Sequence, residues 1–290
     1  MKNVPPNLRS LQDRIRNIAH DTGEEETRLR TTVALVVVGQ MLPEGVIKGG
    51  SAMALRCGRN TRFTKDFDAA RMSPLEDFRA EFEESLEIGW EGFTGRLIEK
   101  APPTPAGVPS GYVMQPFEVK LSYGGKSWCT VDFELGHNEI DDASDPEKRI
   151  SDELVRLFTE LGFSAPAPVP VMRIDHQIAQ KIHAVSAAGS DRARDLVDLQ
   201  ILVKQEKVDY RIVSGTCRRL FEYRKAHEWP PAVTVGDNWV SLYDKEREGL
   251  DVLGSVEDAV AWLNDLIQKI ERNSTTSALY TQSGRPSPSL

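Results

Sequence analysis

Two short segments, close together in the sequence, constrain this chain most. In the first, the apolar pair Val46-Ile47 runs into Lys48, Gly49, Gly50 and Ser51; in the second, Asp66 and Asp68 stand one residue apart. The expected layout is a strand, a Gly-Ser turn, a helix and a neighbouring strand carrying both carboxylates. Alternate side chains of a strand share a face, so the two carboxylates can bind one Mg²⁺ or bridge two. Glycines and a helix N-terminus admit phosphate oxygens. The segments therefore predict a site for a nucleoside triphosphate and its metals.

A third carboxylate is expected because two-metal phosphoryl chemistry draws on several oxygen ligands. Asp132 fits this role, since it lies between Val131 and Phe133 in a predicted strand over residues 127–135. Glu134 shares its face and is the alternative ligand. An isolated Asp-x-Asp is more often a turn or a solvated edge, so the prediction depends on the Gly-Gly-Ser segment and on Asp132 together.

Lys181 lies in a predicted helix over residues 175–187, beside an apolar stripe of Ile178, Ile182 and Val185. A lysine in that position either extends its amine to solvent or meets an anion. In a triphosphate site it would neutralise the β and γ oxygens. Both interpretations remain open from the sequence.

Asp195 and Asp198 are three positions apart (i and i+3) and therefore lie on one face of a helix. They can orient Lys181, complete a metal shell, or pair with Arg192 and Arg194. A plain surface cluster of ion pairs is the alternative. Arg62 opens the segment that ends in the Asp-x-Asp pair, where its guanidinium can contact triphosphate or brace the loop. An exposed loop arginine without a role in binding is the alternative that the sequence favours slightly.

The distribution of charge along the sequence indicates whether the chain could bind nucleic acid. The 290-residue chain carries a net charge of −8, which argues against a protein that coats nucleic acid. Residues 171–227, however, contain 11 Lys and Arg against 7 Asp and Glu, and residues 211–229 interleave arginines with aromatic side chains. Such a face can bind a phosphate backbone and stacked bases. An amphipathic helix with a solvated basic face explains the pattern as well.

Composition and cysteine spacing indicate an ordinary globular protein of one large or two modest domains. The three cysteines are far apart, which indicates neither a zinc site nor a disulfide framework. No segment has the apolar core of a signal sequence or the length of a membrane span. We therefore expect a cytoplasmic protein.

The expected architecture is α/β. Residues 1–169 combine N-terminal helices with a mixed sheet of about four to six strands, because a Gly124-Gly125 hairpin makes its two flanking strands antiparallel. A Pro-rich loop is expected over residues 101–111. Residues 170–272 form a helical domain, and residues 273–290 a disordered tail. The segments 73–76 and 255–258 resemble helix-starting capping boxes.

Four motifs in order resemble the nucleotidyltransferase AbiEii/AbiGii toxin family, which includes the MenT-like toxins of bacterial toxin–antitoxin systems. They are Lys48 to Ser51, Arg62 to Asp68, Lys181 to Ala184 and Arg194 to Leu199, and the resemblance covers about residues 30 to 205. It implies a polymerase-β-like nucleotidyltransferase domain followed by a helical domain. By the same resemblance, Gly50 and Ser51 hold the triphosphate, the paired aspartates hold the metals, and Lys181 with Asp195 or Asp198 completes the site.

Together, the site residues and the resemblance predict a Mg²⁺- or Mn²⁺-dependent toxin that transfers a nucleotide from an NTP to an RNA 3′ end. The expected acceptor is tRNA, and the expected partner is a cognate antitoxin. Transfer to a protein hydroxyl or a small molecule, and an inactive NTP-binding module, are the alternatives. Thr64 adds a hypothesis: a phosphate there would place about two negative charges beside the metal aspartates and repel NTP.

Overall fold

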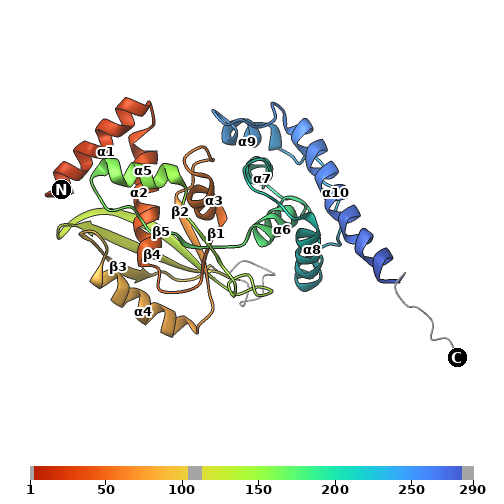
Figure 1. Ribbon diagram of the computed structural model, residues 1–290, viewed down its shortest axis with the longest axis horizontal. Helices are drawn as coiled ribbons and strands as arrows, with labels where there is room; N and C mark the ends of the chain where they lie inside the picture. The colour runs from red at the N-terminus through yellow and green to blue at the C-terminus, as the bar shows by residue number, and fades with distance from the viewer. Residues whose placement is uncertain (1–2, 104–112, 283–290) are drawn as a thin grey trace. The chain divides into compact units, whose positions relative to one another are not determined.

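The computed structural model describes residues 3–103 and 113–282 and divides into two compact units, residues 1–173 and 174–290. Figure 1 shows the helices and strands of each unit. Most of the Pro-rich loop expected over residues 101–111, and the last eight residues of the expected disordered tail, lie outside the described residues.

The first unit is built on a mixed sheet that has seven strands among the described residues, in the order β3-β4-β5-β2-β1-β7-β6. The strands are β1 (Val46–Lys48), β2 (Asp66–Arg71), β3 (Phe93–Glu99), β4 (Gln115–Tyr123), β5 (Lys126–His137), β6 (Glu147–Arg149) and β7 (Val169–Val171). β4 and β5 are antiparallel, whereas β2 and β5 are parallel. The prediction of a mixed sheet is confirmed. The predicted number of about four to six strands was too low, because β6 and β7 have three residues each and are too short to show an alternating pattern.

Helices bury one face of this sheet. The helices α1 (Leu8–Thr22), α2 (Glu26–Met41), α4 (Leu75–Ile88) and α5 (Asp152–Leu161) contribute to one hydrophobic core with the inward side chains of the strands. Phe67 of β2 stacks on Phe133 of β5 with ring centroids 5.5 Å apart, and Phe82 of α4 packs 5.2 Å from Phe133. Because neighbours along a strand alternate, the residues beside Phe67 and Phe133 point to the opposite face.

The capping boxes predicted at the starts of two helices are confirmed at one of them only. Ser73 does not cap α4, since its hydroxyl donates to Glu44 Oε1 and no side chain caps that helix. Helix α5 was missed, although Ser151 accepts a bond from Leu154 N at its start and left-handed Gly162 ends it. The capping box at Ser255 is confirmed, because its hydroxyl accepts from Asp258 N.

The second unit is helical, as predicted. It contains α6 (Ile174–Val185), α7 (Arg194–Gln205), α8 (Tyr210–Arg224), α9 (Trp239–Glu246) and α10 (Val256–Gln282). α6 packs against both α7 and α8, and α8 packs against α10. Helix α10 continues to Gln282, past residue 273 where the disordered tail was expected to begin. No helix in the described ranges is long and apolar enough to cross a membrane.

Candidate active site

The Gly-Gly-Ser segment forms the first turn of helix α3 (Gly49–Cys57) and not a separate turn before it. Lys48 at the end of β1 is the extended residue that precedes the helix. Gly49 has φ +62°, in the left-handed region that favours glycine. A Cβ on Gly49 would lie 1.8 Å from Asp68 Oδ2, so only glycine lets that carboxylate lie against the start of the helix.

Gly50 allows a second close approach at the same helix start. A Cβ there would lie 2.7 Å from Thr64 Oγ1 and 3.2 Å from Arg62 Nη2. The loop between α3 and β2 therefore lies directly against the first turn of α3 and brings a guanidinium to it. The first N–H groups of a helix have no partner within the helix and attract anions. Arg62 and this turn together place cationic and N–H donors where phosphate oxygens could bind.

Ser51 is placed differently from what its sequence position suggested. Its side chain is fully buried, and its hydroxyl donates to the backbone carbonyl of Asp66 at 2.7 Å. The hydroxyl therefore ties α3 to β2 and holds the helix start beside the aspartates. Arg56, near the other end of α3, adds a second anchor by donating to Met172 O at 2.9 Å and to Glu147 Oε2 at 2.6 Å.

The predicted metal carboxylates share the sheet face opposite the core. β2 and β5 are paired in register, so that Asp66 lies beside Asp132 and Asp68 beside Glu134. Lys48 on β1 pairs with Asp68 from the other side. Burial and the negative charges of Asp66 and Asp132 raise the pKa of Glu134, an effect that the Lys48 amine partly offsets. The four carboxylates thus crowd one patch of the sheet.

Asp132 forms an ion pair that the sequence did not predict. Lys100 Nζ lies 3.2 Å from Asp132 Oδ1 and 3.2 Å from Glu118 Oε1. Across the described ranges, no group of three or more His, Cys, Asp or Glu is gathered closely enough to bind a metal ion. Mg²⁺ commonly takes only one or two protein carboxylates and fills its shell with water and substrate phosphates. Asp66 and Asp68, beside the first turn of α3, have the ligand chemistry of that kind of site.

The loop between α3 and β2 is held by one arginine from α2 and by ion pairs of one of its own arginines. Arg28 on α2 donates to the carbonyls of Arg59, at 2.6 Å, and Thr61. Arg59 in turn pairs with Glu153 at 2.8 Å and with Glu24 at 2.7 Å. Sequence reasoning missed this network because its partners are 31 to 94 residues apart and leave no local pattern.

In the second unit, Lys181 and the two predicted aspartates form a buried cluster. Lys181 Nζ donates to Asp195 Oδ1 at 2.9 Å and to Asp198 Oδ2 at 2.5 Å, and both aspartates are fully buried. Arg192 Nε donates to the other oxygen of Asp195 at 2.9 Å. Burial raises the pKa of Asp195, but Lys181 and Arg192 outweigh it and lower that pKa to about 2. The aspartates orient the lysine and are no surface cluster; Arg194 is exposed.

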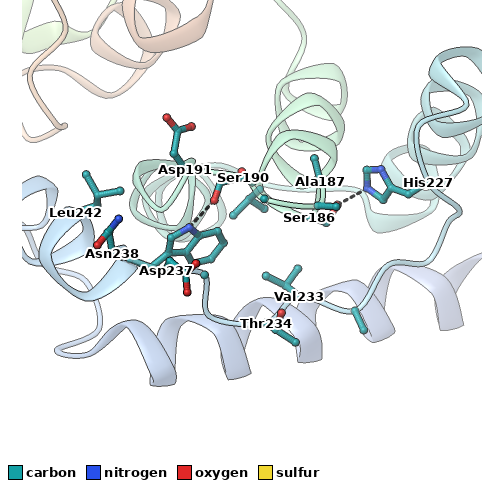
Figure 2. A pocket seen from close by; sticks show the side chains of 16 residues that line it. Ser186, Ala187, Ser190, Asp191, His227, Val233, Thr234, Asp237, Asn238 and Leu242 are labelled. Carbon is teal, nitrogen blue, oxygen red and sulfur yellow. Dashed lines mark hydrogen bonds between the residues drawn. The ribbon is translucent and has the colours of Figure 1, made fainter. Parts of the chain in front are cut away.

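A separate pocket of about 460 Å³ lies in the second unit (Figure 2). Ser186 Oγ and His227 Nε2 lie 2.7 Å apart in its wall, and burial lowers the pKa of His227. Asp191 and Asp237 line the pocket, and neither Lys nor Arg occurs among its described lining residues. Its negative charge makes it unsuitable for a triphosphate and suitable for an amine.

The geometry can be compared with known proteins. Residues 39–273 match the family model of the nucleotidyl transferase AbiEii toxin of type IV toxin–antitoxin systems. The chain belongs to this family. It is thus a nucleotidyltransferase toxin by family, as its sequence motifs predicted.

Solved structures with a similar course of the chain include MenT4, a nucleotidyltransferase toxin of Mycobacterium tuberculosis. It shares 16% identity at a TM-score of 0.49, over 90% of this chain and 98% of MenT4. Another is the antibiotic-resistance factor ANT(2'')-Ia, with 18% identity and a TM-score of 0.37, over 69% of this chain and 94% of that one. No curated protein matches the sequence.

Proposed function

We propose that this AbiEii-family chain transfers a nucleoside monophosphate from an NTP to the 3′-hydroxyl of an RNA, with tRNA as the acceptor. The observation that carries the proposal is the contact of Asp68 and Arg62 with the glycines of one helix turn. Carboxylates for a metal and donors for phosphate thereby lie side by side. A site that binds metal-complexed triphosphate requires this combination.

In this reaction the RNA 3′-oxygen attacks the α-phosphorus of the NTP, and its proton passes to water. A new phosphorus–oxygen bond forms as the bond to the β-phosphate breaks, and pyrophosphate leaves. Arg62 and the N–H groups at the start of α3 bind the triphosphate and fix its orientation. Mg²⁺ or Mn²⁺, held by Asp66 and Asp68 with Asp132 or Glu134 in support, would stabilise the charge on the phosphate oxygens.

Lys181 is proposed as the phosphate-neutralising amine of the second unit. Asp195 and Asp198 fix its position, because two buried carboxylates hold the ammonium from both sides. We assign the two aspartates as positioning residues. With Arg192, the cluster has two positive and two negative groups, which is how a buried set of charges is tolerated.

The exposed face of α8 supports RNA as the acceptor. Arg211, Arg218 and Arg219 are exposed on this helix, and Lys225 follows it. Trp229 lies in the segment after the helix, where its indole N–H donates to Glu271 at 2.8 Å. Cationic side chains with an adjacent aromatic ring suit phosphate backbone and stacked bases.

Substitution of three exposed arginines tests this assignment. We expect Arg211→Ala, Arg218→Ala and Arg219→Ala, combined in one variant, to raise the KM for tRNA and to leave the KM for NTP unchanged. Arg218 also pairs with Glu271, so the double variant Arg211→Ala with Arg219→Ala controls for loss of that ion pair. An unchanged KM for tRNA in both variants would contradict RNA binding on α8.

A second acceptor class is favoured by the carboxylate-lined pocket of Figure 2. A small molecule bearing amino groups would complement Asp191 and Asp237 there. The amounts of label transferred from α-³²P-labelled NTP to RNA, to protein and to small molecules show which class is the acceptor. Label in an amine-bearing small molecule, and none in RNA, would replace the first proposal by this one.

We further propose that the activity arrests growth and that a cognate antitoxin from a neighbouring gene relieves the arrest, as type IV systems imply. Induced expression of the chain, alone and together with the adjacent gene, tests this. Growth arrest by wild type, by Asp68→Ala and by Lys181→Ala alike would show that the toxicity does not depend on transfer.

A further inference from the structure

Lys100, the residue after β3, bridges two carboxylates on the sheet face of the proposed metal ligands. Its Nζ lies 3.2 Å from Asp132 Oδ1 on β5 and 3.2 Å from Glu118 Oε1 on β4. Glu118, Asp132 and Asp66 are in register across β4, β5 and β2, so their side chains leave the same face. All four residues belong to the first unit. One ammonium group therefore joins two members of a row of three carboxylates.

The contact between Lys100 and Asp132 opposes metal binding at that carboxylate. Mg²⁺ binds carboxylate oxygens at about 2 Å. An ion on Asp132 Oδ1 would therefore stand within a few ångströms of the Lys100 amine, and two cations at such a separation repel each other. Lys100 and a metal ion thus compete for the same oxygen.

Glu118 offers the amine a second partner when Asp132 is taken. The strand order places β4 on the side of β5 that faces away from β2, so Glu118 is one strand farther from Asp66. The Glu118 side chain is 28% exposed and that of Asp132 is 60% exposed, so Asp132 is the more accessible to an ion from solvent. Exposed ion pairs contribute little to stability, so the loss of one of the two contacts costs little.

We propose that Lys100 is a positioning residue for Asp132, and that it yields this carboxylate to a metal ion by moving onto Glu118 alone. An ion held by Asp66 and Asp68 leaves both Lys100 contacts intact. The inference rests on the proposed function, from which it takes the metal ligands. It goes beyond that function because it gives Lys100 and Glu118 a role in deciding when Asp132 is available.

The first test measures binding of Mn²⁺ alone, as the affinity and number of ions bound per chain, by electron paramagnetic resonance of the free ion. Asp132→Asn should lose the weaker ion, which identifies the one that Asp132 holds. Lys100→Met should lower the Kd of this ion about three- to tenfold, and Lys100→Arg should not. Lys120→Met is the matched control, because Lys120 lies on the same face, 3.7 Å from Glu118 Oε2. It should change the Kd less than about twofold.

A double-mutant cycle separates the role of Glu118 as a partner of Lys100 from a direct effect of its charge on the ion. Glu118→Gln should raise the Kd of the weaker ion about threefold or more when Lys100 is present, because the amine then stays on Asp132. In the Lys100→Met background, Glu118→Gln should change this Kd little. A direct effect of charge would instead raise the Kd equally in both backgrounds.

Several outcomes would overturn the inference. They are an equal Kd for wild type and Lys100→Met, an equal effect of Glu118→Gln in the two backgrounds, and the absence of an Asp132-dependent ion from both wild type and Lys100→Met. Unfolding temperatures should be the same for wild type and Lys100→Met, because the lost contacts are exposed. Mn²⁺ binding that neither Asp66→Asn nor Asp68→Asn weakens would instead overturn the metal ligands of the proposed function.

Discussion

At the scale of single residues, two glycines decide how closely charged groups approach the start of α3. Gly49 leaves room for the Asp68 carboxylate, and Gly50 leaves room for Thr64 and Arg62. The common face of Asp66 and Asp68 could be predicted from the sequence because strand alternation is a local property. The bond from Ser51 to Asp66 O and the pair between Lys100 and Asp132 could not, since each partner is brought by the fold.

Gly50→Ala tests the first of these contacts. The added Cβ would lie 2.8 Å from Thr64 Cβ, so the loop with Arg62 has to move away from the helix start. We expect kcat/KM for nucleotidyl transfer to fall about a hundredfold, since misplacement of a catalytic group by about 1 Å is enough for that loss. Steady-state kinetics would be compared with Gly215→Ala, where a Cβ meets nothing within 4 Å. Equal activity of the two variants would contradict the cradle.

Thr64→Glu tests the effect of negative charge at the same place. The carboxylate would stand against Gly50 and close to the proposed phosphate cradle, so we expect the Kd for NTP to rise at least tenfold, with a smaller rise in Thr64→Val. The affinity would be measured by direct NTP titration. Equal affinity of Thr64→Glu and Thr64→Val would sink the hypothesis that phosphorylation at Thr64 repels NTP.

The buried Lys181 cluster predicts a specific pH dependence of stability. The pKa of Asp195 is lowered from its usual 3.8 to about 2, so its charge stabilises the fold above about pH 4 and that stabilisation is lost as the pH falls toward 2. The shift corresponds to about 2 kcal/mol at neutral pH. Urea unfolding should show Asp195→Asn destabilised by at least about that amount at pH 7 relative to Asp191→Asn, with the difference narrowing below pH 4. A difference independent of pH would contradict the assignment.

At the scale of elements, the proposed site includes the loop between α3 and β2, and contacts from other elements hold this loop in place. Arg28 reaches from α2 to the carbonyls of Arg59 and Thr61, and thereby fixes the segment that carries Arg62. The sequence predicted the strand, helix and strand around this loop because their apolar patterns and glycines are local signals. It did not predict what holds the loop, because α2 and α5 supply those contacts from a distance.

Arg28→Ala should therefore lower kcat/KM for transfer about tenfold through a looser loop, and lower the free energy of unfolding by about 1–3 kcal/mol. Arg30→Ala, an exposed change on the same helix, should alter neither quantity. Kinetics and urea unfolding of both variants provide the comparison. Full transfer activity in a destabilised Arg28→Ala protein would show that the loop needs no such support.

At the scale of the whole molecule, the residues assigned to chemistry are divided between two units. The first unit contains the proposed phosphate cradle and the carboxylates, and the second contains Lys181, its two aspartates and the basic face of α8. The α/β character of the first unit and the helical character of the second could be predicted from residue patterns. The short strands β6 and β7 and the helix α9 could not, since a few residues give too weak a periodic signal.

The most direct test of the account is transfer of label from each α-³²P-labelled NTP, with Mg²⁺, into total tRNA. Wild type, Asp68→Ala and Lys181→Ala would be assayed together, with Asp191→Asn as a control that removes a carboxylate outside the assigned catalytic residues. The account predicts labelled tRNA with wild type and the control, and at least a hundredfold less with the other two variants. Equal labelling by wild type and Asp68→Ala, or label in protein and none in RNA, would contradict it.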